Sequence, residues 1–192
     1  MLTSLKIYAR QNNVPITKDD TMEFILNYIN DNKVKTILEI GTAIGYGCIN
    51  MAMCDSVKRI DTVEISLDNY KQALINIANY NMVDRIDAHL MDARLFIDEC
   101  DKKFDLIYLD GPKGQYINYL PRLLELLNPN GVIIADNIFF HGMVNGEIPT
   151  PASCRSMVNG LRHYVDEVTH HERLTSHIYQ IGDGICVTKI RS

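Results

Sequence analysis

The sequence predicts an α/β protein with a doubly wound sheet of seven strands, and three features indicate it. Five short runs with strand character alternate with segments of helical periodicity, as in successive β-α units. A glycine-rich turn, 41–47, follows the first of these runs. Near the end of the chain, Gly182-Asp183-Gly184 separates two further strand-like runs, which predicts a C-terminal antiparallel hairpin.

Local sequence features support each predicted element. The run 104–109 is mostly apolar, which is typical of a strand buried on both faces of a parallel sheet. Ser66 and Asp92 can cap the helices that follow them, and Thr17 with Asp19-Asp20 can cap an earlier helix. The expected strands are 34–40, 59–64, 86–91, 104–110, 131–137, 174–181 and 185–190. The expected helices are 2–10, 17–30, 48–54, 66–81, 93–100, 114–127 and 153–169.

Length and composition indicate one domain, with N-terminal helices (1–30) before a core (34–192). At 192 residues and 46% hydrophobic, the chain is long enough to bury a sizeable core. A net charge of −5 gives no basic field over the whole molecule, so a nucleic-acid partner would need a local patch. The five cysteines lack a C-x-x-C pair, and no apolar stretch is long enough for a membrane span. We therefore expect a cytoplasmic protein with reduced thiols.

Acidic and amide side chains end two consecutive predicted strands. Asp110 ends one strand, and Asp136-Asn137 ends the next. Ligands of open α/β sheets bind outside the carboxyl ends of the strands, and neighbouring strands lie about 4.8 Å apart. Three oxygen donors with no nearby thiolate suit a hard cation, Mg²⁺ first, with Mn²⁺ or Ca²⁺ as alternatives. The structural alternative is that these residues only turn the chain or cap a helix.

Lys113 lies in the loop three residues after Asp110. A cation beside it would disfavour the charged form of its amine, which would then be usable as a general base. Otherwise Lys113 is a solvated loop charge. Tyr108 and His141 lie near these motifs in the sequence and receive no role. The loop that carries His141, 138–152, contains two glycines and two prolines, and loops of this length are often functional.

The glycine-rich turn predicts a cofactor site. Glycines let the backbone turn sharply and let a ligand approach closely, although the spacing is not that of a dinucleotide fingerprint. Glu64 ends the second predicted strand, where a carboxylate can bind a ribose diol, and Asp92-Ala93 ends the third. Together these positions favour a nucleoside-bearing cofactor over a purely structural turn.

Several motifs together resemble the cation-dependent, S-adenosylmethionine-using O-methyltransferases, a family that includes the catechol and caffeoyl-CoA enzymes. Within that family the likeness is closest to the bacterial tRNA 5-hydroxyuridine methyltransferases. The resemblance implies a Rossmann-like, class I methyltransferase fold and a homodimer. The motifs that carry it are EIGTAIGYGCINMA (39–52), Glu64, LDGPKGQY (109–116), ADNIFFHGMV (135–144) and the segment 182–189. Gly111-Pro112 departs from the family's more usual residues at that point.

The resemblance also implies a role for each site residue. The residues implied to hold the methionine part of S-adenosylmethionine are Glu39, Gly41, Thr42, Gly45, Tyr46 and Gly47. Those implied to contact the nucleoside are Glu64 at the ribose, Asp92 and Ala93 at the adenine, and Asp110. The implied cation ligands are Asp110, Asp136 and Asn137. Lys113 is the implied base.

The expected reaction is methyl transfer to a hydroxyl that has a neighbouring oxygen. The first expected acceptor is 5-hydroxyuridine in the tRNA anticodon loop, whose 5-hydroxyl and 4-carbonyl are vicinal. A catechol-like small molecule is the alternative, and the acidic pI of about 5.6 favours it. Two interpretations from other classes are a non-catalytic cofactor- or RNA-binding domain and a nicotinamide-dependent dehydrogenase.

Overall fold

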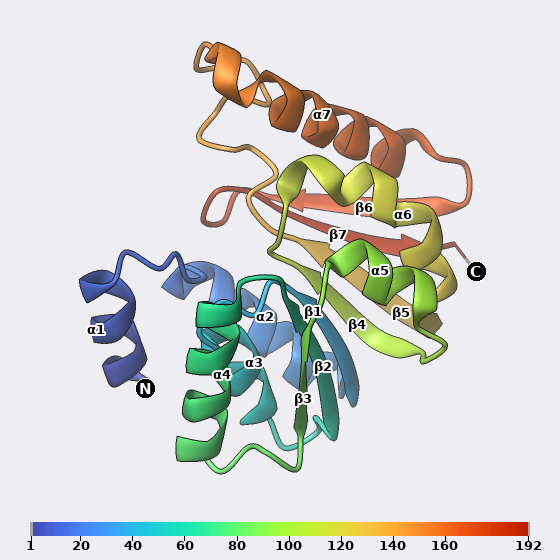
Figure 1. The fold of residues 1–192 in the computed structure, drawn as a ribbon. Helices are drawn as coiled ribbons and strands as arrows, with labels where there is room; N and C mark the ends of the chain where they lie inside the picture. Colours follow the sequence, from blue (N-terminus) through green and yellow to red (C-terminus); the bar gives the residue numbers. More distant parts are fainter. Residues whose placement is uncertain (1, 192) are drawn as a thin grey trace. The chain divides into compact units, whose positions relative to one another are not determined.

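The computed structural model describes residues 2–191, which form a seven-stranded sheet (Figure 1). The strands are β1 (Thr36–Ile40), β2 (Arg59–Glu64), β3 (Ile86–Leu90), β4 (Phe104–Leu109), β5 (Leu127–Ala135), β6 (Leu174–Tyr179) and β7 (Ile185–Ile190). Their order is β3-β2-β1-β4-β5-β7-β6. The first five strands run parallel where they pair within β1–β3 and within β4–β5, whereas β7 is antiparallel to both β5 and β6. This confirms the predicted doubly wound sheet and its C-terminal antiparallel hairpin.

Helices connect these strands in the predicted order. They are α1 (Thr3–Gln11), α2 (Asp19–Asn32), α3 (Tyr46–Ala52), α4 (Leu67–Asn79), α5 (Ala93–Glu99), α6 (Tyr116–Glu125) and α7 (Arg155–His170), with short 3₁₀ helices η1 (Lys113–Gln115) and η2 (Ala152–Cys154). Ser66 caps α4 as predicted, accepting from the Asn69 N–H at 3.4 Å. The predicted cap of α2 is wrong. Its N-cap is Lys18, without a side-chain hydrogen bond.

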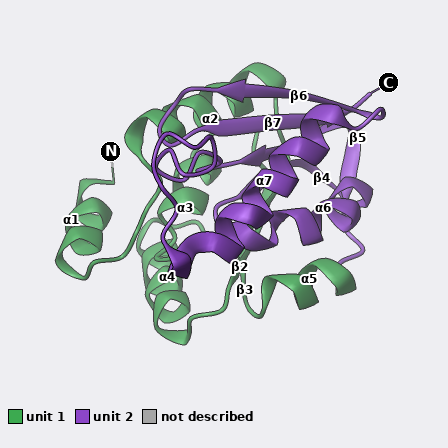
Figure 2. Cartoon of the chain, turned by 90° about the horizontal axis from the view of Figure 1, so that it is seen from above, with its two compact units in different colours: residues 1–99 green, residues 100–192 purple. Residues whose placement is uncertain are grey.

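The chain divides into two compact units, residues 1–99 and 100–192, coloured separately in Figure 2. The first contains β1–β3 with α1–α5, and the second contains β4–β7 with α6 and α7. Each has its own buried apolar side chains, such as Ile37 and Ile60 in the first and Leu106 and Ile133 in the second. Within the described residues, none of the helices is long and apolar enough to cross a membrane.

One strand differs from its predicted limits in a way that affects the site. β5 begins at Leu127, four residues earlier than expected, and ends at Ala135. Phe104 pairs with Leu127, but the register then shifts before Leu106. Such an irregularity accommodates Pro129, which has no N–H to donate to a neighbouring strand. Asp136 and Asn137 therefore follow the strand rather than end it.

Candidate active site

The loop after β1 has a backbone that few residues other than glycine adopt easily. Gly41 and Gly45 have φ angles of 106° and 85°, in the left-handed region, and Ala43 has a φ of 46°. The Gly41 and Thr42 N–H groups donate to the Val63 carbonyl at 3.0 and 3.2 Å, which ties the loop to β2. The predicted glycine-rich turn therefore exists, and its sharp turn leads directly into α3.

Glu39 lies buried near the end of β1, next to this loop. Only 1% of its surface is exposed, and the Thr62 hydroxyl donates to its Oε2 at 2.5 Å. A second hydroxyl, Thr42 Oγ1, lies 2.7 Å from Thr62 Oγ1. The other Glu39 oxygen faces Gly47, where an added Cβ would lie 2.1 Å from Oε1. The Glu39 carboxylate therefore lies against the first turn of α3. Residue 47 in that turn must be a glycine, because a side chain would collide with the carboxylate.

Replacing Gly47 with alanine is expected to weaken S-adenosylmethionine binding about tenfold or more, equivalent to about 1.4 kcal/mol. The new methyl group would push the Glu39 carboxylate away from Thr62 and displace the loop backbone. Isothermal titration calorimetry of the cofactor would measure the loss. Gly146→Ala is the control for backbone strain without a collision, because nothing lies within 4 Å of a Cβ added there although its φ of 82° is unfavourable for alanine. Equal losses in both variants would contradict the steric explanation.

Tyr46, also expected at the cofactor, is buried at the start of α3. Its hydroxyl donates to Asp19 Oδ1 at 3.5 Å, and Asp19 pairs with Lys6 at 2.5 Å. A hollow of about 800 Å³ lies beside this pair, lined by residues within 6–20. The side chain of Tyr46 therefore connects the start of α3 to the N-terminal helices.

Glu64, the last residue of β2, is held in place by backbone hydrogen bonds. Its carboxylate accepts three backbone N–H groups, from Ala43 at 2.8 Å on Oε2 and from Ile65 and Ser66 at 3.0 and 2.8 Å on Oε1. A carboxylate has about four acceptor positions, so Oε2 can accept one further donor. The three amides hold the carboxylate in one orientation, which suits a group that binds a ribose hydroxyl.

Asp92 lies after β3, and its Oδ1 accepts the Arg94 N–H at 2.8 Å. Asp92 thus caps α5, as the sequence predicts, and Ala93 is the first residue of that helix. Both lie at the carboxyl end of β3, as Glu64 does for β2 and the glycine-rich loop does for β1. Within residues 1–99, the expected cofactor residues therefore follow three neighbouring strands. Their contacts with a cofactor remain a prediction.

In the second unit, Asp110 and Asp136 follow two paired strands. Leu109 of β4 lies opposite Ala135 of β5, and the Asp136 N–H donates to the Leu109 carbonyl at 3.0 Å. Asn137 comes next, with a left-handed φ of 57°, and its N–H donates to Asp136 Oδ1 at 2.7 Å. The strand pairing thus places both carboxylates at the same edge, as the sequence predicts.

The two carboxylates interact unfavourably. Burial first, and then the negative charge of Asp110, raise the pKa of Asp136 from 3.8 to about 6, against the hydrogen bonds from the Asn137 N–H and the Tyr108 hydroxyl and the positive charge of Lys113. The Tyr108 hydroxyl lies 3.2 Å from Asp136 Oδ2. A divalent cation would relieve this repulsion, and carboxylate and amide oxygens are its preferred ligands. The residues therefore fit the predicted magnesium site.

Lys113 lies beside this pair of acids. Its Nζ donates to Asp110 Oδ1 at 3.2 Å, and its side chain is 18% exposed. Lys113 begins η1, directly after Pro112. The 3₁₀ turn places the amine next to a predicted cation ligand, where a general base for a cation-bound hydroxyl would have to lie.

The loop after Asn137 is held by backbone and side-chain contacts. The Ile138 and Phe139 N–H groups donate to carbonyls of the β6–β7 turn at 3.1 and 3.0 Å. The His141 N–H donates to the Asp183 carboxylate at 2.9 Å, whereas the His141 side chain is 70% exposed. The loop is therefore anchored at its beginning.

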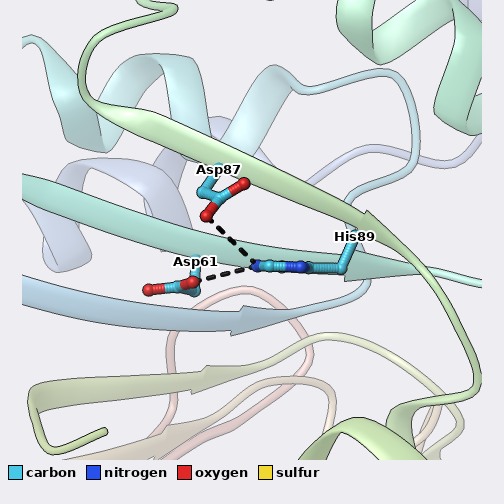
Figure 3. Close-up of side chains that lie close together, drawn as sticks. All are labelled: Asp61, Asp87 and His89. Atoms are coloured by element: carbon cyan, nitrogen blue, oxygen red, sulfur yellow. Dashed lines mark hydrogen bonds and ion pairs between the residues drawn. The ribbon is translucent and has the colours of Figure 1, made fainter.

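One cluster of acidic and histidine side chains was not predicted from the sequence. Asp61, Asp87 and His89 form a group whose possible metal-ligating atoms all lie within 4.8 Å of one another (Figure 3). His89 Nε2 lies 2.9 Å from Asp61 and 3.8 Å from Asp87. Asp61 pairs with Asp87 in the β2–β3 register, and His89 lies two residues after Asp87 on the same face. The alternation Asp87-x-His89 was visible in the sequence, but only the strand pairing brings Asp61 opposite it.

Arg59 pairs with both acids of this cluster. Its guanidinium lies 3.3 Å from Asp61 and 2.9 Å from Asp87. The carboxylates therefore already have a cationic partner, and the group forms an ion-pair network across β2 and β3.

Comparisons with known proteins agree with this arrangement. A family model described as O-methyltransferase matches residues 2–191. A caffeoyl-CoA O-methyltransferase from Zinnia elegans is 27% identical over 188 residues, which cover 92% of this chain and 76% of that protein. Caffeoyl-CoA O-methyltransferase 1 from Eucalyptus globulus is 29% identical, with 92% and 75% covered.

Solved structures share the fold. A candidate caffeoyl-CoA O-methyltransferase from Staphylococcus aureus superposes with a TM-score of 0.91 at 29% identity, covering 98% of this chain and 91% of that one. An O-methyltransferase from Bacillus cereus in complex with SAH gives a TM-score of 0.84 at 23% identity, covering 99% and 90%. Because the family model spans nearly the whole sequence, the chain belongs to the O-methyltransferase family and is an S-adenosylmethionine-dependent enzyme of that family.

Proposed function

We propose that this enzyme methylates a hydroxyl whose neighbouring oxygen allows both atoms to bind one divalent cation. The observation that carries the proposal is the pair Asp110 and Asp136 at the ends of two paired strands, with Lys113 Nζ 3.2 Å from Asp110. Two acids and a lysine in this arrangement suit an acceptor that must be bound and deprotonated at one place.

The first unit holds the cofactor in this proposal. The Glu64 carboxylate binds the ribose hydroxyls, and the loop 41–47 binds the methionine part, while Asp92 and Ala93 lie at the adenine. When bound, S-adenosylmethionine supplies the methyl group. The residues themselves contribute orientation, which is a major part of the rate gain in a transfer between two bound groups.

The second unit holds the cation and the acceptor. Asp110, Asp136 and Asn137 would hold the cation, which would favour the deprotonated form of a bound hydroxyl. The Lys113 amine accepts the hydroxyl proton, and its position beside Asp110 keeps it within reach of an acceptor held there. Tyr108 keeps the Asp136 carboxylate oriented through its hydroxyl.

A small catechol-like acceptor is the first candidate. The relatives that match 92% of this chain are named for caffeoyl-CoA, and the net charge of −5 disfavours a long polyanion such as tRNA more than it disfavours a small acceptor. Vicinal phenolic oxygens are spaced to bind one cation together. The cation chemistry of the second unit and the charge of the molecule therefore support the same class of acceptor.

A second candidate is 5-hydroxyuridine in tRNA. The motifs LDGPKGQY and ADNIFFHG support it, since they resemble those of the bacterial tRNA 5-hydroxyuridine methyltransferases. The 5-hydroxyl and 4-carbonyl of this base are vicinal, as catechol oxygens are. A single-stranded anticodon base can be turned out into a pocket, so a broad basic groove is not required.

One assay separates the two candidates. Labelled S-adenosylmethionine is incubated with caffeoyl-CoA, with catechol and with hydroxyuridine-containing tRNA, each with Mg²⁺ and with EDTA. We expect Mg²⁺-dependent labelling of a small acceptor. Labelling of tRNA alone would replace the first candidate with the second, whereas labelling that persists in EDTA would contradict the role of the cation.

A further inference from the structure

Two glycines meet where α7 packs against η1. A Cβ added to Gly160, in the middle of α7, would lie 2.4 Å from the Gly114 carbonyl oxygen and 3.0 Å from its Cα. In the other direction, a Cβ on Gly114 would lie 3.0 Å from the Cα of Met157. The contact is therefore between two backbones, with no side chain between them.

Gly160 makes α7 less stable than alanine would, so the helix alone does not explain why a glycine is there. Glycine in a helix interior is less favourable than alanine, because it loses more backbone freedom on folding. The other residues on the inner side of α7 are large, with Val158, Leu161 and Tyr164 all buried. A glycine among them is needed only if the backbone of η1 must come this close.

The segment that Gly160 contacts is the one that carries Lys113. η1 spans Lys113–Gln115, and the Gln115 N–H closes it by donating to the Pro112 carbonyl at 2.8 Å. Gly114 is the middle residue of this turn. Displacing its carbonyl would therefore move the backbone of Lys113 and with it the Nζ that lies 3.2 Å from Asp110.

We propose that Gly160 is a positioning residue for Lys113. By admitting the Gly114 backbone, it fixes η1 against α7 and so fixes where the Lys113 amine lies relative to Asp110. What Lys113 does there rests on the proposed function, whereas the contact itself does not. Nothing in the sequence around Lys113 indicates this dependence, because Gly160 follows it by 47 positions (160 − 113).

The same helix also holds the segment after Asn137. The Arg162 guanidinium donates to the Met143 and Val144 carbonyls at 2.7 and 3.0 Å. Two residues of α7 that are close in sequence thus contact the loop after β4 and the loop after β5. α7 is a common support for the two segments that follow the predicted cation ligands.

The test compares Gly160→Ala with wild type by two measurements. Hydrogen exchange measures the exchange rate of the Gln115 amide. Methyl-transfer assays measure kcat, the KM for S-adenosylmethionine and the dependence of the rate on Mg²⁺. We expect faster exchange at Gln115 and a kcat at least about tenfold lower, with the KM for S-adenosylmethionine and the Mg²⁺ dependence within about twofold. Helix propensity alone predicts the opposite sign, since alanine would strengthen α7. The control is Asn159→Ala, an exposed neighbour on α7.

A double mutant shows whether Gly160 acts through Lys113. In a Lys113→Met background, adding Gly160→Ala should cause no further loss in the single-turnover rate, because coupled positions are not additive. An equal additional loss would overturn the proposal, as would wild-type exchange at Gln115 in Gly160→Ala. If wild type methylates none of the acceptors tested, the proposed function fails, and the exchange measurement still decides the contact. If Gly160→Ala does not fold, Gly114→Ala makes the milder clash and should show the same signature.

Discussion

Replacing Lys113 with methionine is expected to lower kcat by roughly 10²–10⁴-fold, the usual contribution of a general base. Methionine keeps much of the length and apolar volume of the lysine stem but cannot accept a proton. Lys113 makes its contact with Asp110 at the predicted cation site, and its side chain is only 18% exposed, so bulk water has limited access to replace it. A quenched-flow, single-turnover assay of methyl transfer to caffeoyl-CoA or catechol would measure the loss.

Two further variants identify the reason for that loss. Lys113→Arg keeps the positive charge, yet arginine stays protonated, so it should be as inactive as the methionine variant if Lys113 is a base. Lys71→Met replaces an exposed lysine on α4 and should leave kcat unchanged. Activity of Lys113→Arg within about tenfold of wild type would show that the charge matters and proton transfer does not.

Asp136→Asn is expected to abolish Mg²⁺-dependent methylation and, without metal, to make the protein more stable. Burial and the charge of Asp110 raise the pKa of Asp136 from 3.8 to about 6, so the ionised carboxylate destabilises the folded protein at neutral pH. A shift of about 2 units corresponds to about 3 kcal/mol as an upper value. Asparagine keeps an oxygen to accept the Asn137 N–H, and the Tyr108 hydroxyl can accept from its amide.

The pH dependence gives the sign of this effect. Between about pH 4 and pH 6 the folded state binds more protons at Asp136 than the unfolded state does, so the free energy of unfolding falls as pH rises through this window. The stabilising contribution is fully present below pH 4 and is lost above pH 6. Denaturant titrations in EDTA should show this slope in wild type and a reduced slope in Asp136→Asn.

Adding Mg²⁺ should reverse the order of stability. A ligand that binds only the folded state stabilises it in proportion to RT ln(1 + [L]/Kd), so wild type should gain with Mg²⁺ and Asp136→Asn should not. Asp98→Asn removes an exposed acid on α5 and should behave like wild type. Equal stabilisation of wild type and Asp136→Asn by Mg²⁺ would place the cation elsewhere, with the Asp61, Asp87 and His89 cluster as the next position to test.

Much of the candidate site was predictable because its residues follow strands. A buried parallel strand has a distinctive apolar run, and the residue after it lies at the ligand-binding edge whatever the details of packing. The positions of Glu64, Asp110 and Asp136 at the carboxyl ends of their strands follow from this rule, whereas their roles remain predictions. The glycine-rich turn was equally visible, since Gly41 and Gly45 adopt backbone angles that favour glycine.

Residues that act through distant contacts were not predictable in this way. The partners of Arg59 could not be assigned, because they are set by the β2–β3 register. The start of β5 depended on pairing of Leu127 with Phe104, which outweighed the unfavourable Pro129. Gly47 was predicted in the loop, but it lies in the first turn of α3. There the Glu39 carboxylate leaves no room for a Cβ, and only the folded structure shows this contact.

The sequence by itself determined the order of strands and helices along the chain, which residues lie at the strand ends, and the family of the protein. It could do so because period, turn residues and strand-end positions are local properties of the chain. The tertiary structure alone decided that burial and the charge of Asp110 raise the pKa of Asp136, that Asp61 meets His89, and that Gly160 contacts the turn carrying Lys113. Those contacts join residues distant in sequence, and only burial and strand register bring their atoms within reach.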